Sequence, residues 1–263
     1  MHKVEEKTAQ SLSANGAELL PYLPYMLQDL WELGSNPEDI IELIKKNIPY
    51  KSEMKVLDLA CGKGAVSIKL AQLIECSIKG IDIISEFIGE ANIKAKELNI
   101  YEKCEYIVGD INEAIEHEKN YDIVILGAVG EVLGTPIETI QKLKKVVSPQ
   151  GYIILVDAYA RDNPTSELRS KSDVFPLYSE WISIFKQAEV VLVEARSTNE
   201  NKMAEQNEIN NSFIIKRAGE LKKMHPDKQS LFEEYVQNQL DECLDIEENI
   251  VGVTWLLKER GHL

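Results

Sequence analysis

Short, nearly continuous apolar runs alternate along the middle of this chain with longer amphipathic stretches. Runs of this length predict strands, and they fall at residues 55–60, 77–82, 104–109, 121–127 and 152–157. The stretches between them space apolar residues by three and four positions, which predicts helices at residues 65–75, 86–98, 112–118 and 137–147. Ser85 stands where it can cap the second of these helices. The alternation predicts a doubly wound α/β sheet with right-handed crossovers.

Both ends of the chain depart from this alternation. Residues 18–47 predict two helices, of which the first is interrupted by Pro21 and Pro24 and ends at Gly34, while the second is capped by Asn36. Towards the C-terminus the pattern predicts a helix, a strand, a polar helical stretch and a last strand, at residues 179–188, 190–195, 199–248 and 250–258. The ends therefore add helical elements to a central sheet.

Composition narrows the class of protein. A chain of 263 residues with 44% hydrophobic content suits one sizeable domain with an elaboration, or at most two domains. The net charge of -15 repels phosphate backbones and anionic lipid, so we expect neither a nucleic-acid partner nor a membrane partner. No apolar run approaches the roughly 20 residues of a membrane span, and the first seven residues have no signal-like apolar core. These features predict a cytoplasmic protein.

The spacing of the cysteines and histidines does not indicate a disulfide pair or a metal site. The four cysteines are scattered without a C-x-x-C pair, which predicts reduced thiols, and the four histidines lack the spacing of a zinc site. We expect no metal.

The segment from Val56 to Gly64 carries the strongest functional signal. An apolar run containing Asp58 turns through Gly62 and Gly64 into the helix that begins near Ala65. Glycines let the main chain approach a ligand closely, and the free N–H groups of a helix's first turn face that ligand. The segment therefore predicts a cradle for a nucleotide-like molecule.

One candidate ligand is a dinucleotide. In that interpretation Gly62-x-Gly64 begins a G-x-G-x-x-G fingerprint, and Asp82, twenty residues beyond Gly62, binds the ribose diol. Ser67 at the third glycine position departs from the fingerprint. Asp58 would also stand close to the pyrophosphate and oppose its charge.

The other candidate is S-adenosylmethionine, which has no phosphate. Asp58 then orders the glycine loop near a positively charged ligand, and Asp82 accepts two hydrogen bonds from the ribose diol. Asp110 accepts a hydrogen bond from the adenine amino group, and the main-chain N–H of Ile111 meets a ring nitrogen. This interpretation requires the Asp82 carboxylate to lie at the glycine bend, and the bend to be open.

At this point the sequence resembles a known family, the class I S-adenosylmethionine-dependent methyltransferases. The resemblance covers roughly residues 55–157 and consists of five motifs in order: Val56–Gly64, Gly80-Ile81-Asp82-Ile83, Gly109-Asp110-Ile111, Tyr121–Gly127 and Leu143–Tyr152. Ala60 stands where the family usually has glycine. The cofactor-binding residues that the resemblance implies are Asp58, Ala60, Gly62, Gly64, Asp82, Ile83, Asp110, Ile111 and Gly127.

The resemblance also implies an architecture. It predicts a Rossmann-like sheet of seven mostly parallel strands, with the last strand antiparallel between the fifth and the sixth. An N-terminal helical cap would occupy residues 1–50, and the methyltransferase domain residues 51–263. The helical insertion before the last strand would lie at about residues 199–248.

The predicted function is methyl transfer from S-adenosylmethionine to the oxygen or nitrogen of a small-molecule acceptor. The family shares no catalytic residue, so none is assigned; candidates beyond the fourth and fifth strands are Glu131, Tyr159 and Arg161. Two alternatives remain open. The first is a non-catalytic cofactor-binding sensor or assembly module, and the second is a nicotinamide-dependent oxidoreductase. The oligomeric state is not predicted.

Several of these residues also have purely structural interpretations. Asp58 would be a surface turn residue, Asp82 a helix-start carboxylate and Asp110 a helix cap. Gly127 would simply end its strand. Helical spacing makes packing, rather than a substrate pocket, the expected role of three aromatic residues: Tyr22, Tyr25 and Trp31.

Overall fold

A computed structural model describes residues 2–49, 51, 53–161 and 175–261. The chain divides into two compact units. The sheet unit comprises residues 31–157, 178–197 and 253–263, and the helical unit comprises residues 1–30, 158–177 and 198–252. The helix that follows Asn36 belongs to the sheet unit in this division, and the expected domain boundary at residue 50 stays a prediction.

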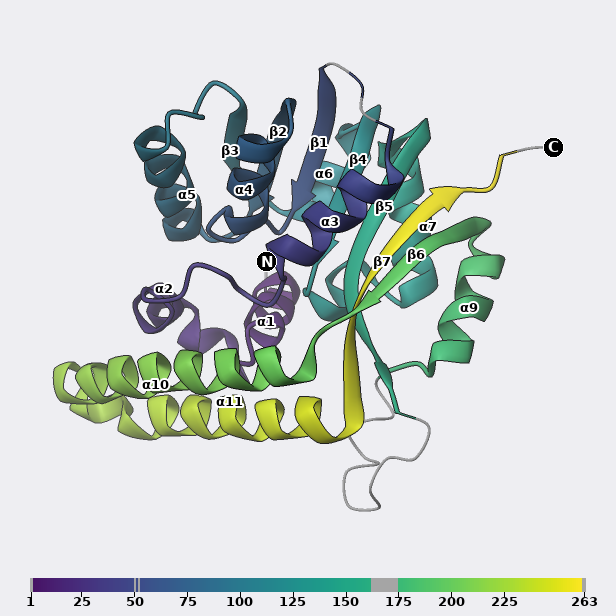
Figure 1. Cartoon of the computed structure of the whole chain (residues 1–263). Coiled ribbons are helices and arrows are strands. Elements are labelled where there is room, and N and C mark those ends of the chain that lie inside the picture. Colours follow the sequence, from purple (N-terminus) through teal and green to yellow (C-terminus); the bar gives the residue numbers. More distant parts are fainter. Residues whose placement is uncertain (1, 50, 52, 162–174, 262–263) are drawn as a thin grey trace. The chain divides into compact units, whose positions relative to one another are not determined.

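Seven strands of the described chain form one sheet, in the order β3-β2-β1-β4-β5-β7-β6 (Figure 1). Their bounds are β1 Met54–Leu59, β2 Cys76–Asp82, β3 Cys104–Val108, β4 Tyr121–Gly127, β5 Val147–Ala160, β6 Val190–Ser197 and β7 Ile250–Glu259. Strand β1 pairs in parallel with β2 and β4, whereas β6 and β7 are antiparallel. The predicted sheet is confirmed, including the last strand between the fifth and the sixth.

Helices cover both faces of this sheet. Neighbouring helices α3, α4 and α5 pack on one face, and α6, α7 and α9 on the other (Figure 1). Their bounds are α3 Pro37–Asn47, α4 Ala65–Leu73, α5 Ser85–Glu97, α6 Ile111–His117, α7 Pro136–Val146 and α9 Tyr178–Gln187, with a short 3-10 turn, η2, at Gly130–Leu133. The central strands are buried on both faces, as in other parallel sheets, and carry much of the core.

Local signals explain the start of α3 but not that of α5. Asn36 caps α3 as predicted, since its side chain accepts the Glu38 N–H at 2.9 Å. The prediction that Ser85 caps α5 is wrong: Ile84 holds the cap position, and the Ser85 hydroxyl contacts Glu86 instead. The Ile84 N–H donates to Asp82. A carboxylate at the end of β2 therefore holds the main-chain N–H of the cap residue itself.

The helical unit is built on two long helices, α10 Glu200–Met224 and α11 Gln229–Asn249, joined by the turn η3 Pro226–Lys228. They pack side by side (Figure 1). The N-terminal segment adds α1 His2–Ser11, η1 Ala17–Tyr22 and α2 Leu23–Met26. The single helix expected before Gly34 is therefore broken into two short turns, because neither Pro21 nor Pro24 donates a main-chain hydrogen bond. The pattern did not predict α1.

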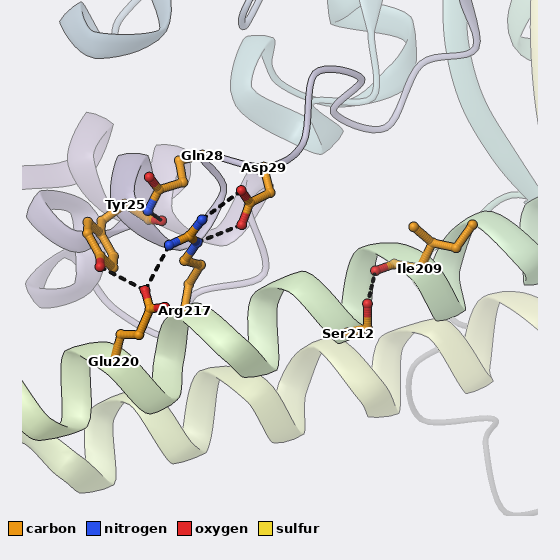
Figure 2. Close-up of polar contacts among 7 residues, drawn as sticks. All are labelled: Tyr25, Gln28, Asp29, Ile209, Ser212, Arg217 and Glu220. Atoms are coloured by element: carbon orange, nitrogen blue, oxygen red, sulfur yellow. Dashed lines mark hydrogen bonds and ion pairs between the residues drawn. The ribbon is translucent and has the colours of Figure 1, made fainter.

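Polar contacts fasten α2 and the residues after it to α10 within this unit. The guanidinium of Arg217 donates to both carboxylate oxygens of Asp29, from Nε at 2.6 Å and from Nη2 at 2.8 Å, and also to Glu220 (Figure 2). Tyr25 donates to the same Glu220 at 2.8 Å. The Tyr22 ring packs edge-on against Phe232, with centroids 5.1 Å apart. Both tyrosines thus take structural contacts in this unit.

None of the helices in the described part of the chain combines the length and the apolarity needed to cross a bilayer.

Candidate functional site

A five-residue loop, Ala60 to Gly64, joins β1 to α4 and is called the glycine loop below. Three of its residues have left-handed backbones: Ala60 at φ 55, Gly62 at φ 54 and Gly64 at φ 73. Glycine adopts this region freely, whereas an L-residue such as alanine pays roughly 1–2 kcal/mol. Ala60 is the position where the resemblance expects glycine, and its backbone shows why glycine is usual there.

Close packing gives two glycines of this region a second purpose. Gly80 of β2 lies beside Tyr106 of β3 in the parallel register, and a Cβ on Gly80 would stand 2.6 Å from the tyrosine ring. A Cβ on Gly64 would stand 2.9 Å from the same tyrosine's hydroxyl oxygen. The missing side chain at Gly64 therefore makes room for Tyr106, a reason that the glycine pattern alone did not reveal.

The Asp82 carboxylate lies at the glycine bend, as the interpretation requires. Its Oδ2 accepts the Gly62 N–H at 2.8 Å, and its Oδ1 accepts the Ile84 N–H at 2.9 Å. The residue is 8% exposed, and burial raises the pKa of its carboxyl, against which these two donors act. The Ile83 N–H also acts on this carboxyl and lowers its pKa. A carboxylate offers about four lone-pair sites, so Asp82 keeps some acceptor capacity beyond its main-chain donors.

Asp58 is buried beneath the loop. It is 4% exposed and accepts the hydroxyl hydrogen of Ser67, which stands in the first turn of α4. The pKa of Asp58 is raised to about 7. Burial is the largest cause and the charge of Asp82 adds to it, while the Ser67 hydrogen bond acts in the opposite direction. The interpretation of Asp58 as a surface turn residue is therefore wrong.

The carboxyl ends of β2 and β3 meet beside Asp82. The Gly109 N–H donates to the Asp82 carbonyl at 2.9 Å. Asp110 caps α6 by accepting the Asn112 N–H at 2.8 Å, which confirms the structural interpretation of this residue, and Ile111 is the first, buried residue of α6. Two apolar side chains stay exposed at this edge: Ile83 at 38% and Val108 at 50%.

The segment from Trp31 to Ser35 packs against the glycine loop and the end of β4. The Trp31 indole N–H donates to the Lys63 carbonyl at 3.2 Å. The Leu33 side chain lies 3.4 Å from where a Gly62 Cβ would be, and Ser35 occupies the space beside Gly127. The sequence pattern predicts that a helix ends at Gly34, but α2 already ends at Met26, and Gly34, at φ 87, lies in the non-helical segment that follows.

The glycine loop nevertheless keeps an accessible edge, since Ala60, Cys61 and Gly62 are all partly exposed. Together with Asp82 and the exposed apolar pair of Ile83 and Val108, this edge offers main-chain groups, two carboxylate acceptors and an apolar flank. Such a set suits a nucleoside, which carries a diol on its sugar and a flat apolar base.

The candidates for catalysis lie in different parts of the described chain. Glu131 is exposed in η2, and Arg161 of the helical unit pairs with Glu200 at 2.6 Å. Tyr159 also belongs to the helical unit. Catalytic roles for these residues stay predictions. Within the described ranges, no three His, Cys, Asp or Glu side chains gather as a metal site would require.

This sheet order, with a glycine loop after β1 and a carboxylate ending β2, is that of the class I S-adenosylmethionine-dependent methyltransferases. A family model described as "Methyltransferase domain" matches residues 50–208, which is more than half of the chain. The chain therefore belongs to this methyltransferase family.

Solved structures and curated relatives agree with that assignment. The chain resembles a SAM-dependent methyltransferase from Geobacter sulfurreducens, crystallised with S-adenosyl-L-homocysteine, with a TM-score of 0.76 and 17% identity over 91% of this chain and 98% of that one. It also resembles the cyclase SpnF, with a TM-score of 0.70 and 12% identity over 98% of this chain and 97% of that one. At these identities the likeness concerns the fold.

A curated relative, a ubiquinone biosynthesis O-methyltransferase of Rickettsia akari, is 34% identical over 119 residues, or 45% of this chain. The match spans 46% of that relative, so the chain covers about half the length of the curated protein.

Proposed function

We propose that this chain is an S-adenosylmethionine-dependent methyltransferase that acts on the oxygen or nitrogen of a small molecule. The observation that carries the proposal is the Asp82 carboxylate, bonded at 2.8 Å to the Gly62 N–H at the open edge of the glycine loop. A loop that holds the cofactor tail and a carboxylate that binds its sugar would have to be adjacent, and the bond between Gly62 and Asp82 supports this pairing.

The residues at this edge fit the cofactor. The remaining acceptor capacity of the Asp82 carboxylate would bind the ribose diol, and Ile83 and Val108 would flank the adenine. Asp110, beyond its capping bond, and the Ile111 N–H would meet the polar edge of the base. Ala60, Gly62 and Gly64 would bring the main chain to the cofactor tail, and Gly127 stands at the end of the neighbouring strand.

When bound, S-adenosylmethionine supplies an activated methyl group on its sulfonium. The protein's part is then to align an acceptor with that methyl group, and orientation of this kind contributes roughly 7–11 kcal/mol in favourable cases. A general base is needed only where the acceptor must lose a proton. This explains why no single catalytic residue defines the family.

The position of Asp58 favours this cofactor over a dinucleotide. Its carboxyl group bonds Ser67 in the first turn of α4, where a pyrophosphate would seek the helix N-terminus. Any ionised fraction of Asp58 there opposes a phosphate and favours a cationic ligand.

The acceptor is proposed to be small because the net charge of -15 disfavours a nucleic acid. Since the Rickettsia relative is named an O-methyltransferase, hydroxyl compounds are the first acceptors to test.

Isothermal titration with S-adenosylmethionine and S-adenosylhomocysteine tests the proposal. We expect Asp82→Asn to weaken binding of both by about tenfold or more, because a hydrogen bond to a charged group contributes about 1.5–3 kcal/mol. Asp122→Asn is the matched control. Asp122 also accepts a main-chain N–H, from Lys55 at 2.9 Å, but it stands near the opposite, amino end of its strand. Absence of binding to the wild-type protein at millimolar cofactor would overturn the proposal.

The alternatives have distinct outcomes. Binding without methyl transfer to any acceptor of a hydroxyl and amine panel, together with a stably copurifying protein, supports a sensor or assembly module. Fluorescence enhancement of NADH on binding supports the oxidoreductase.

A further inference from the structure

Lys63 belongs to the glycine loop, and its charged side chain is buried. Its side chain is only 1% exposed, and its ammonium pairs with Glu90 of α5 at 2.9 Å. The same ammonium lies 5.5 Å from the centre of the Phe87 ring, also on α5. A buried charge is tolerated only where a partner compensates the lost hydration. Lys63 therefore ties the glycine loop to α5 from within.

Trp31 holds the same residue from another side. Its indole N–H donates to the Lys63 carbonyl at 3.2 Å. The ammonium groups of Lys69 on α4 and Lys94 on α5 lie 5.4 Å and 5.6 Å from its ring, within the range of a cation–π contact. Glu32, the next residue, pairs with Lys69 at 2.6 Å. The indole is thus held by cations from two helices while it bonds the loop.

The glycine loop needs such support because its conformation is costly. Ala60, Gly62 and Gly64 all have positive φ, and glycines are free to leave that region. A loop that samples several shapes binds a ligand more weakly, in proportion to the fraction of molecules in the competent shape. Asp82 holds the Gly62 N–H, and main-chain bonds join the Cys61 N–H to the Ile81 carbonyl and the Gly64 N–H to the Cys61 carbonyl. The contacts to Lys63 add a restraint from α5 and from Trp31, outside the loop and β2.

We propose that Trp31 and Glu90 are positioning residues, which hold the glycine loop through Lys63 in the shape that receives the nucleoside cofactor. This inference rests on the proposed function for the identity of the ligand. Neither residue belongs to the sequence motifs of the family resemblance. Trp31 acts on the loop main chain, and Glu90 acts on the Lys63 ammonium.

Trp31→Phe tests the first contact, because it keeps an aromatic ring between the two cations and removes the indole N–H. We expect S-adenosylhomocysteine to bind about 5-fold more weakly, the value of one ordinary hydrogen bond. Lys69→Gln is the comparison variant: it removes one cation from the ring and keeps the indole bond, so its effect should be smaller. A larger effect of Lys69→Gln than of Trp31→Phe overturns the role of the indole bond.

Glu90→Gln tests the second contact. It removes the Glu90 carboxylate charge from the buried Lys63 ammonium, and we expect a loss of affinity of about tenfold. Glu97→Gln is the matched control on the same helix, since Glu97 is 59% exposed and pairs with Lys94 at 3.6 Å. If Glu90→Gln does not fold, Lys63→Met with Glu90→Gln replaces the pair by an apolar side chain of similar length. This double variant should fold, and its loop amides should exchange hydrogen more slowly than those of Glu90→Gln.

Two measurements separate positioning from general destabilisation. Hydrogen exchange of the free protein should rise within residues 58–67 in Trp31→Phe and Glu90→Gln, and stay unchanged in β5 and β7. Tryptophan emission should change when the cofactor product binds, and Trp31→Phe should abolish the change, because Trp181 and Trp255 are fully buried against each other elsewhere in the sheet unit. Exchange unaltered in the loop, or an emission change that survives Trp31→Phe, overturns the proposal.

The failure of this inference is distinct from a failure of the proposed function. If the wild-type protein binds S-adenosylhomocysteine and all variants bind it equally, the positioning role is refuted and the methyltransferase proposal stands. If the wild-type protein binds no cofactor, the proposed function fails and this inference fails with it.

Discussion

Replacing Asp58 by asparagine should stabilise the protein in alkaline solution and leave it nearly unchanged in acid. Asp58 is 4% exposed under the glycine loop, and its pKa is raised from 3.8 to about 7, mainly by burial. Asparagine keeps an oxygen that accepts the Ser67 hydroxyl hydrogen and carries no charge to be buried. The variant therefore removes the cost of ionisation and preserves the contact.

The sign and the size follow from linkage. Because the folded-state pKa lies above the unfolded one, the protonated carboxyl contributes stability that is complete below pH 3.8 and is lost as pH rises to about 7. Across this window unfolding releases one proton, so the free energy of unfolding falls by about 1.4 kcal/mol per pH unit. The total difference between wild type and Asp58→Asn should approach about 4 kcal/mol above pH 7.

Urea denaturation between pH 4.5 and 8.5, followed by tryptophan emission, measures this difference. All three tryptophans of the chain lie in the sheet unit, so the signal reports the unit that contains Asp58. The difference between variant and wild type should grow with pH and level off above 7. Parallel pH profiles for the two proteins would refute the burial argument.

Two neighbouring variants sharpen the test. Ser67→Ala removes the hydrogen bond that lowers the Asp58 pKa, so the window of declining stability should extend to higher pH. Asp82→Asn removes a charge that raises the same pKa, so the window should move to lower pH. A shift in the same direction for both variants contradicts this electrostatic account.

Three further predictions concern packing and local order. Gly80→Ala should destabilise the protein by about 1–3 kcal/mol, because its Cβ would stand 2.6 Å from the Tyr106 ring; an unchanged thermal midpoint contradicts this. Gly89→Ala, within α5 and with open space around the added Cβ, should instead stabilise by about 0.5–1 kcal/mol in the same thermal assay. Arg217→Ala should speed amide exchange in residues 23–29, since it removes the fork that binds Asp29; unaltered exchange there shows that α2 is held by other contacts.

The apolar runs in the sequence were sufficient to predict the sheet, because each central strand is buried on both faces. Such strands must be apolar throughout, and the predicted run at residues 121–127 coincides with β4. The flanks were harder to predict. The run predicted at residues 152–157 is part of a longer strand, β5 Val147–Ala160. At its amino end this strand includes the predicted turn residues, and its pairing with β4 has a register irregularity between Tyr121 and Ile123.

The candidate site, too, could be predicted only in part from the sequence. The motif spacing placed Gly62 and Asp82 together correctly, because strands β1 and β2 are adjacent, parallel and in fixed register. The spacing did not reveal that Tyr106 requires the absence of a side chain at Gly64. That contact joins residues more than forty positions apart, and no local signal at Tyr106 distinguishes it from any other strand residue.

The chain by itself determined the order of strands and helices, the family and the position of the glycine loop, since these depend on burial period and on residues close in sequence. Only the tertiary structure decided how the loop is held. Trp31 and Glu90 reach Lys63 from segments 32 positions before it and 27 positions after it. A buried ammonium and a main-chain carbonyl accept partners from any part of a chain that folding brings near, and the linear sequence does not record that choice.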